Sequence, residues 1–395
     1  MKIRDSFLSI AVPDITEAEI AEVVDALKSG WISVGPKTRQ FEADFAAYHG
    51  AKHAIAMSSC TAAQFLICKV LGLGPGDYAI VPTMTWPSTA STVEQVGATP
   101  LFADVDRHTL NTTPALVEPL LKRYAGKVKL ISPVHMSGLP VDIEGFDALG
   151  AKYGVPVVYD AAHAVFSDYR GKRVGSYGRA SVFSFYATKN ITAGDGGIVT
   201  TGDDALSDEL RLWSYHGMAK DAWKRYSKEG ASSHVQCLVP GFKFNMTDLN
   251  AGLALAQLRR ADELRDKRNA LIEEYQSLLA GHAWLERPTI TDGDGRWGNH
   301  VYGIKVLDDD VDRDVMMQKL KEYNIGTNIH FYPVHQQYYY DRKYPDVRLP
   351  VAEWLGQRLI SLPLCTRYTR DDLAYVAEAL DDIHRRRLAH RTTRS

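Results

Sequence analysis

The first part of the chain has the hydrophobic spacing of an amphipathic helix. Thr16 and Glu19 stand three residues apart and form a capping-box pattern, which is typical of a helix N-terminus. Apolar residues then return every three or four positions, at Ile20, Val23, Val24 and Leu27. Gly30 follows as a stop signal. The pattern predicts a helix between Thr16 and Gly30.

Short apolar runs of strand length then follow one another along the chain. They lie at residues 53–59, 78–82, 99–105, 128–134, 155–160, 180–185 and 196–201. Helical patterns come between some of them, at 61–73 and 143–154. Nearly continuous apolar strands that alternate with helices favour an α/β fold, in which helices cover both faces of a mostly parallel sheet.

The character of the sequence changes near residue 246. Residues 247–281 form one long helical pattern with at most one break, and a shorter helical pattern follows at 311–324. A last helix is expected after Thr369, which forms a second capping-box pattern with Asp372. We therefore predict a large domain over residues 1–246 and a smaller α+β domain over residues 247–395.

Composition narrows the class of protein. The chain has 395 residues, 45% of them hydrophobic, and a formal net charge of −2, so nothing draws it to nucleic acid or to an anionic membrane. No apolar run reaches the length of a membrane-spanning helix, and the start lacks the pattern of a signal peptide. The four cysteines form no CxxC pair, so we expect a cytoplasmic protein without a disulfide framework.

Several common sites are absent from the sequence. There is no phosphate-loop motif, no HExxH zinc motif and no GxSxG nucleophile elbow. The glycine-rich stretch at 72–77 precedes a strand and lacks dinucleotide-binding spacing, so we expect a turn there. The thirteen histidines do not show metal-ligand spacing, and we expect no metal.

Three short stretches fit the chemistry of pyridoxal phosphate. Asp160 ends the apolar run 155–160, and Lys189 comes just after the run 180–185, so both lie at one sheet edge if those strands are parallel. Thr61 and Ala62 open a helix whose free N–H groups suit a phosphate. A lysine can form a Schiff base with the cofactor, and an aspartate can keep its ring nitrogen protonated. Taken one by one, these residues also fit a solvated lysine, a turn aspartate and an ordinary helix cap.

The sequence as a whole resembles the DegT/DnrJ/EryC1/StrS sugar aminotransferases. The resemblance covers nearly the whole chain in family order, through the segments 29–42, 58–63, 82–106, 134–142, 159–164, 183–197, 216–218, 241–258 and 324–335. It implies the aspartate-aminotransferase fold, known as PLP-dependent transferase fold type I. One difference is conservative, since Asp195 stands where many members have Glu.

The resemblance also assigns cofactor-binding roles. Lys189 matches the Schiff-base lysine and Asp160 the partner of the ring nitrogen, while His163 falls beside the cofactor hydroxyl. Trp86 matches the aromatic residue that stacks on the ring, with a core position as the alternative. The positions matching phosphate-binding residues are Thr61, Ala62, Ser184 and Asn245. In the family the last of these reaches a neighbouring subunit's phosphate, which implies a homodimer with shared active sites.

The resemblance suggests the substrates as well. Family members move an amino group, usually from glutamate, to a keto group of a nucleotide-linked sugar, and this sequence resembles the branch that acts at carbon 4. His330 and Tyr332 are candidates for the substrate mouth, with a core or interface role as the alternative. Four cationic residues are candidates for binding the diphosphate: Lys37, Lys220, Arg225 and Lys228.

Three other functions stay open at this point. Some family members aminate a keto-inositol, and others are sugar dehydratases. The C3-dehydratase branch has histidine in place of the Schiff-base lysine, so Lys189 argues against it, and the scattered cysteines argue against an iron–sulfur cluster. A binding protein on this fold would not need the lysine amine.

Overall fold

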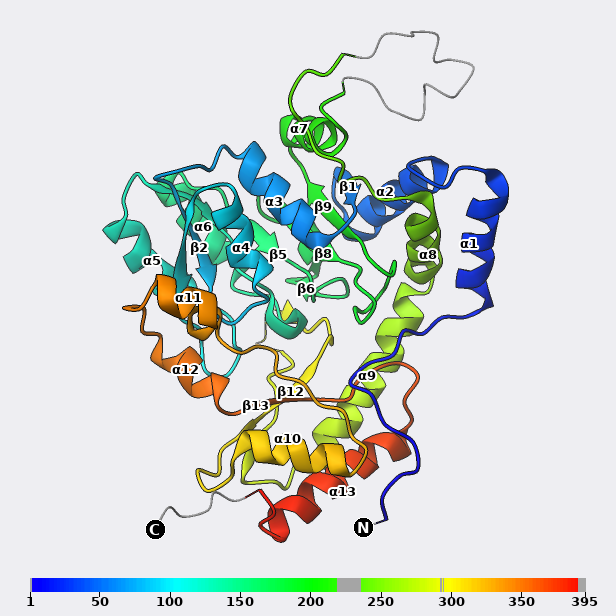
Figure 1. Cartoon of the computed structure of the whole chain (residues 1–395), viewed down its shortest axis with the longest axis vertical. Coiled ribbons are helices and arrows are strands. Elements are labelled where there is room, and N and C mark those ends of the chain that lie inside the picture. Colours follow the sequence, from blue (N-terminus) through cyan, green and yellow to red (C-terminus); the bar gives the residue numbers. More distant parts are fainter. Residues whose placement is uncertain (1, 219–235, 292, 294, 390–395) are drawn as a thin grey trace.

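The computed structural model describes residues 2–218, 236–291, 293 and 295–389. A large α/β part carries the main sheet, and a smaller part with its own sheet lies below it in Figure 1. A mixed α/β architecture with parallel strand pairs is what the sequence predicts. Within the described ranges, no helix has both the length and the apolar character needed to cross a bilayer.

The main sheet consists of two hydrogen-bonded sets of strands, in the orders β1-β9-β8-β5 and β3-β2-β4. Parallel bridges from Ile131 to Val157 and from Val134 to Asp160 join the two sets. The strands are β1 (His53–Met57), β2 (Tyr78–Pro82), β3 (Thr99–Ala103), β4 (Val128–Ile131), β5 (Val158–Asp160), β8 (Ala180–Ser184) and β9 (Gly197–Thr201).

The strand directions follow from the connections. Strand β2 is parallel to β3 and β4, and β5 is parallel to β8, because helices or long connections return the chain to the same edge. Strand β9 is antiparallel to β8 and to β1, since no helix separates it from β8. The sheet is therefore mainly parallel, with one reversed strand. Asp160 and the residues after Ser184 lie at the same carboxyl edge.

Helices cover both faces of this sheet. Side chains of β1 alternate between the two cores: Ala54 and Ala56 face one, and Ile55 and Met57 face the other. The first core also takes residues from α2 (Pro36–His49), α5 (Pro114–Arg123), α6 (Ile143–Tyr153) and α8 (Asp248–Arg259). The second takes residues from α3 (Cys60–Val70), α4 (Ser88–Gln95) and α7 (Asp204–Ser214).

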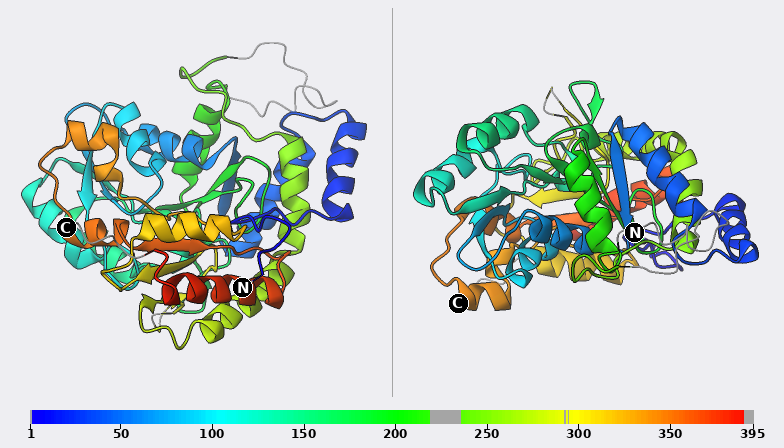
Figure 2. Two further views of the ribbon diagram at one scale, coloured as in Figure 1. Left: turned by 60° about the horizontal axis from the view of Figure 1, so that its bottom comes forward. Right: turned by 90° about the horizontal axis from the view of Figure 1, so that it is seen from above.

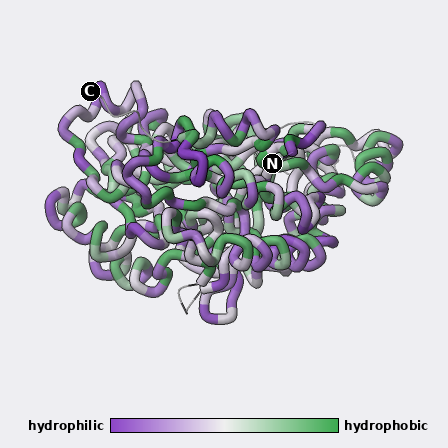
Figure 3. Tube along the Cα trace, turned by 90° about the horizontal axis from the view of Figure 1, so that it is seen from below, coloured by the Kyte–Doolittle hydropathy of each residue, from purple (hydrophilic) through white to green (hydrophobic). Residues whose placement is uncertain are grey.

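The predicted helix starts are confirmed where local chemistry sets them. Helix α1 (Glu17–Ser29) begins with a complete capping box of Thr16 and Glu19, and Gly30 ends it at φ 77°. Helix α13 (Arg370–Arg385) begins with the capping box of Thr369 and Asp372. The outer helices alternate hydrophilic and hydrophobic stretches along the chain trace in Figure 3, as expected for helices with one buried face.

The smaller part is built on the sheet β10 (Leu285–Glu286), β12 (Tyr302–Val306) and β13 (Leu359–Leu362). Helices α9 (Ala261–Leu278), α10 (Arg313–Glu322) and α13 gather around it (Figure 2). Leu8 near the N-terminus also packs there and bridges to Ile325. The remaining elements of the described residues are β6 (Asp168–Tyr169), β7 (Lys172–Arg173), β11 (Gly295–Arg296), α11 (Tyr338–Lys343), α12 (Pro350–Gly356) and the short 3-10 turns Met136–Gly138, Val174–Ser176 and Val334–Gln336.

The long helical pattern 247–281 divides at Arg260 into α8 and α9. Leu255 of α8 and Leu264 of α9 belong to a core of the large part, whereas Ile272 and Tyr275 belong to the core of the small part. The apolar packing thus changes from one part to the other within α9. The domain boundary at residue 246 stays a prediction.

Candidate active site

A cavity of about 540 Å³ opens between the carboxyl edge of the main sheet and the smaller part. The parallel pairing of β5 with β8 places Asp160 and Lys189 in its wall. The other predicted site residues that line it are Thr61, Trp86, His163, Ser184 and His330. Ala62, Asn245 and Tyr332 are not among its lining residues. A volume of this size suits a small-molecule ligand.

Lys189 follows β8 in a turn, in which its backbone N–H donates to the Tyr186 carbonyl at 2.9 Å. Burial lowers the pKa of its amine to about 8, although nearby Cys60 and Asp160 oppose the shift. About a tenth of the amine is therefore neutral at pH 7, far more than for an ordinary lysine. A neutral amine is the form that can attack a carbonyl carbon.

Asp160 is 5% exposed and is surrounded by donors. Burial raises the pKa of its carboxyl group, and three hydrogen bonds together with the charge of Lys189 oppose this rise. The donors are Gln64 Nε2 at 2.6 Å, Thr89 Oγ1 at 3.0 Å and the Ala162 N–H at 3.1 Å. These contacts favour a carboxylate that is ready to receive a cationic partner.

The N-terminus of α3 forms another wall of the cavity. Ser59 is its N-cap, and its hydroxyl accepts the N–H of Ala62 at 3.0 Å. Cys60 and Thr61, the first two residues of the helix, line the cavity. Burial raises the pKa of the Cys60 thiol well above its usual value, so the thiol stays neutral. The wall therefore offers a helix N-terminus without a nearby thiolate, which suits an anion such as a phosphate.

Trp86 lines the cavity with a largely free ring. Its side chain is 63% exposed, and its ring centroid lies 6.1 Å from that of Phe331. The alternative of a core tryptophan is thereby excluded. An exposed aromatic face beside Asp160 and Lys189 can pack on a planar ligand.

Three histidines gather next to Lys189. The ring of His163 lies 4.3 Å from that of His300 and 5.7 Å from that of Phe331, measured between centroids. Burial lowers the pKa of all three, that of His330 to about 4, and Lys189 lowers them further. They are therefore neutral at physiological pH. The Nδ1 atom of His163 is buried and has no partner among the described residues, so it can bond a ligand.

Asn245 and Tyr332 lie outside this cavity wall. Asn245 pairs with Met57 in an antiparallel bridge, and its amide donates to the Met246 carbonyl at 3.0 Å. Tyr332 is 43% exposed, and its carbonyl accepts from Gln337. Lys37 is bound to Glu22 and Asp25, so its charge is already paired within the chain. Lys220, Arg225 and Lys228 lie outside the described residues.

The residues that support the site from behind were not predicted from the sequence. Gln64 and Thr89 hold Asp160, and Asn190 Oδ1 lies 2.8 Å from Nδ1 of His300. One signal was available for Gln64, because it is a polar residue within the apolar run of α3, one turn after Cys60. No local pattern marks Thr89 or Asn190, whose partners come from distant segments.

The cavity fits pyridoxal phosphate. It combines a lysine whose amine is partly neutral, a buried carboxylate, an exposed aromatic face and a helix N-terminus. The described residues contain no cluster of histidine, cysteine, aspartate or glutamate that could hold a metal ion.

Comparison with known proteins agrees with this geometry. Residues 13–381 match the DegT/DnrJ/EryC1/StrS aminotransferase family. The spore coat polysaccharide biosynthesis protein SpsC of Bacillus subtilis is 44% identical over 385 residues, which are 96% of this chain and 98% of SpsC.

Two solved structures are similar in fold and sequence. One is the PLP-form of Spr1654 from Streptococcus pneumoniae, described as a candidate sugar aminotransferase, with a TM-score of 0.87 and 30% identity over 96% of this chain and 99% of that one. The other is the aminotransferase TlmJ from Streptoalloteichus hindustanus, with a TM-score of 0.89 and 30% identity over 97% of this chain and 100% of that one.

Proposed function

Because this chain belongs to the DegT/DnrJ/EryC1/StrS aminotransferase family, we propose that it moves an amino group from glutamate to a keto group, at carbon 4, of a nucleotide-linked sugar in the cytoplasm. Its class is that of a PLP-dependent sugar aminotransferase. The observation that carries the proposal is the convergence of Lys189, Asp160 and the α3 N-terminus on one cavity.

Each wall of the cavity has a proposed task. When bound, pyridoxal phosphate supplies an electron sink for the carbon that exchanges the amino group. Asp160 holds the proton on the ring nitrogen, and Trp86 packs on the ring face. His163, with its free Nδ1, bonds the ring hydroxyl. Thr61 and Ser184, which line the cavity, would hold the phosphate at the start of α3, and Ala62 would add its N–H in place of the bond to the Ser59 hydroxyl.

Lys189 has two tasks that both depend on its lowered pKa. Its Nζ holds the cofactor covalently in the resting enzyme, which requires a neutral amine. When it is not bonded to the cofactor, Nζ would carry a proton to and from the reacting carbon. A base whose pKa lies near the working pH does this most effectively.

The second substrate enters between the two parts of the chain. The cavity wall includes Asn328, His330 and Phe331 from the smaller part, opposite the sheet edge. We infer that His330 contacts the sugar there and that Tyr332, although outside the wall, lies at the mouth. The relation to SpsC, a protein of polysaccharide biosynthesis, supports a sugar substrate.

A homodimer is part of the proposal. Asn245 does not line the cavity of its own chain, and its side chain is held beside the end of β1. This placement agrees with a role at the cofactor phosphate of a second copy, so each site would need both chains. Asn245→Ala should then weaken cofactor binding although the residue lies outside the cavity wall.

A half-reaction assay tests the substrate. The purified enzyme is loaded with glutamate, and the aminated cofactor is offered a panel of UDP- and dTDP-linked keto sugars and a keto-inositol. Only a nucleotide-linked 4-keto sugar should return the original absorbance. Discharge by the keto-inositol alone would make the protein a cyclitol aminotransferase, and release of a deoxygenated sugar would make it a dehydratase.

A further inference from the structure

We propose that Gln64 is a positioning residue, which fixes the carboxylate of Asp160 in the orientation and charge state that amino transfer requires. The inference rests on the proposed function of Asp160. Gln64 lies on α3, one turn after the helix N-terminus that faces the cavity, and it lines the cavity itself. It thus links the proposed phosphate end of the site to the proposed ring-nitrogen end.

The hydrogen bond between Gln64 and Asp160 is short, and both residues are buried. Gln64 Nε2 lies 2.6 Å from Asp160 Oδ2, and the two residues are 8% and 5% exposed. The amide must present its nitrogen here, because an amide oxygen would face a carboxylate oxygen. A hydrogen bond to a buried charged group is stronger than one between neutral groups.

The donors divide unequally between the two carboxylate oxygens. Among the described residues, Oδ2 accepts from Gln64 and from Thr89 Oγ1 at 3.0 Å, whereas Oδ1 accepts only the Ala162 N–H at 3.1 Å. Each carboxylate oxygen can accept about two hydrogen bonds. Oδ2 is therefore fully used, and Oδ1 keeps a free lone pair. Gln64 helps to prevent the carboxylate from rotating and exchanging these roles.

The amide of Gln64 does little else. Its Oε1 is buried and has no hydrogen-bond partner among the described residues. Replacing Gln64 by methionine, which has a similar size, therefore removes the hydrogen bond to Asp160 and deprives no other polar group of its hydrogen-bond partner. This makes Gln64→Met a selective probe of the contact with Asp160.

The expected effect is a shift in pH dependence. Two titratable groups from other elements act on Asp160: Lys189 after β8, which stabilises the carboxylate, and Cys60 on α3, which is neutral. His163, in the loop after β5, is also neutral. Lys189 stabilises the carboxylate by its charge, and Gln64 and Thr89 add side-chain hydrogen bonds to it. Without Gln64 the carboxylate takes up its proton at higher pH.

The test measures the half-reaction with glutamate as a function of pH in the holoenzyme. Gln64→Met should keep the cofactor on Lys189, and the acid limb of the rate should move upward by roughly one to two pH units. The maximal rate near neutral pH should fall about tenfold, with a smaller change in KM. Gln64→Glu, which places a second carboxyl group against Asp160, should move the limb further in the same direction.

Thr92→Val is the matched control. Thr92 lines the same small cavity as Gln64, but its hydroxyl donates to the Ser88 carbonyl and not to Asp160. This variant should keep the wild-type pH profile. If Gln64→Met carries the cofactor and keeps the wild-type pH profile, the positioning role is wrong. If Gln64→Met does not fold, the same result with Gln64→Glu would contradict the role. Failure of the proposed function is separate, because the wild-type protein would then show no cofactor on Lys189.

Discussion

The backbone of Gly197 lies so close to the backbone of Cys60 that there is no room for a side chain at position 197. A Cβ atom on Gly197 would lie 2.4 Å from the backbone nitrogen of Cys60 and 2.5 Å from the carbonyl carbon of Ser59. The first residue of β9 thus packs directly on the first turn of α3, where the cavity offers its helix N-terminus. The glycine sets the position of the proposed phosphate site.

Gly197→Ala should displace the start of α3. Because the contacting atoms belong to the backbone, they cannot move aside as a flexible side chain can, and we expect a loss of about 1–3 kcal/mol in the free energy of unfolding. Affinity for pyridoxal phosphate should fall as well. Denaturant unfolding and a cofactor titration measure the two effects. Gly202→Ala, just beyond the same strand, meets no atom within 4 Å and should change neither.

Lys189→Ala and Lys189→Arg should both abolish covalent attachment of the cofactor. Arginine keeps the positive charge but does not become neutral in proteins, so it cannot replace the amine. Turnover should fall by a factor of about 10² to 10⁴. Borohydride reduction followed by peptide mass mapping locates the attachment. Attachment in either variant would show that another residue holds the cofactor.

The wild-type protein should attach the cofactor faster as the pH rises. The pKa of Lys189 is lowered to about 8, and only the neutral amine attacks, so the rate should increase through that pH and level off above it. Stopped-flow absorbance of the apoprotein mixed with cofactor measures this. A rate that is still climbing steeply two units higher would mean that the amine keeps an ordinary pKa.

Trp86→Ala should weaken cofactor binding by roughly two- to tenfold, since aromatic stacking contributes roughly 0.5–1.5 kcal/mol. Trp86→Phe keeps an aromatic face and should bind nearly as well as the wild type. Because Trp86 is largely exposed, neither change should lower the free energy of unfolding appreciably. Tyr338→Ala is the control, because Tyr338 is also exposed but does not line the cavity. Equal losses in both alanine variants would contradict a stacking role.

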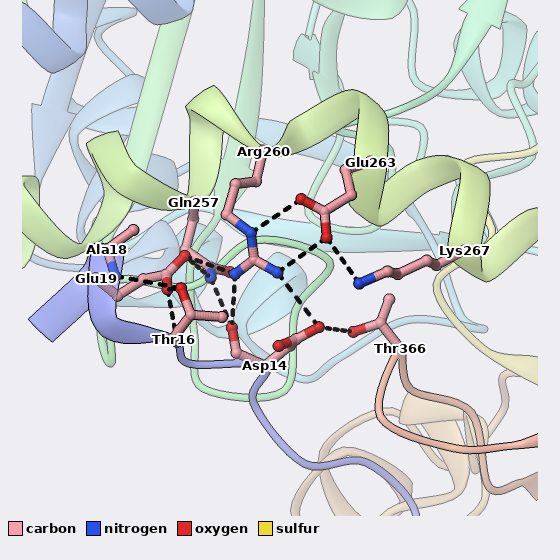
Figure 4. Close-up of polar contacts among 9 residues, drawn as sticks. All are labelled: Asp14, Thr16, Ala18, Glu19, Gln257, Arg260, Glu263, Lys267 and Thr366. Carbon is pink, nitrogen blue, oxygen red and sulfur yellow. Dashed lines mark hydrogen bonds and ion pairs between the residues drawn. The ribbon is translucent and has the colours of Figure 1, made fainter.

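Acid should destabilise the fold through Glu19. Figure 4 shows this side chain bonded to Thr16, Gln257 and Arg260. Burial acts to raise its pKa, but the hydrogen bonds from Thr16 and Arg260 outweigh it and lower the pKa to about 2. A carboxylate whose pKa is lowered by folding stabilises the fold at pH values above its pKa in the unfolded chain, which is near 4.5. This contribution is lost as the pH falls toward 2.

Glu19→Gln should therefore cost about 1.5–3 kcal/mol at neutral pH, because it removes the buried partner of Arg260, which keeps Asp14 and Glu263 as ion-pair partners. The difference from the wild type should shrink in acid. Denaturant unfolding at several pH values measures both. Glu263→Gln removes an exposed partner of the same arginine and should cost no more than about 1 kcal/mol. A similar cost for the two variants would rule out a special role for the buried pair.

The proposed site could be predicted in part because some of its signals are local. Asp160 ends one apolar strand and Lys189 follows another, and parallel strands end at the same edge. The residues behind them could not be predicted in the same way. Thr89 reaches Asp160 from a separate helix, and His300 reaches His163 from the smaller part, so these contacts exist only after the segments pack together. The charge of Lys37 made it a candidate for binding the diphosphate, but its ion pairs with Glu22 and Asp25 form only in the folded chain.

By itself, the sequence determined the features that depend on neighbours along the chain. The capping boxes at Thr16 and Thr369 and the alternation of strands and helices are set by hydrogen bonds and side-chain spacing within a few residues. Only the tertiary structure decided that β9 is antiparallel, that the packing changes core within α9, and that the amine of Lys189 has a lowered pKa. The pKa of Lys189 is lowered by burial, and the residues that bury it come from distant segments of the chain.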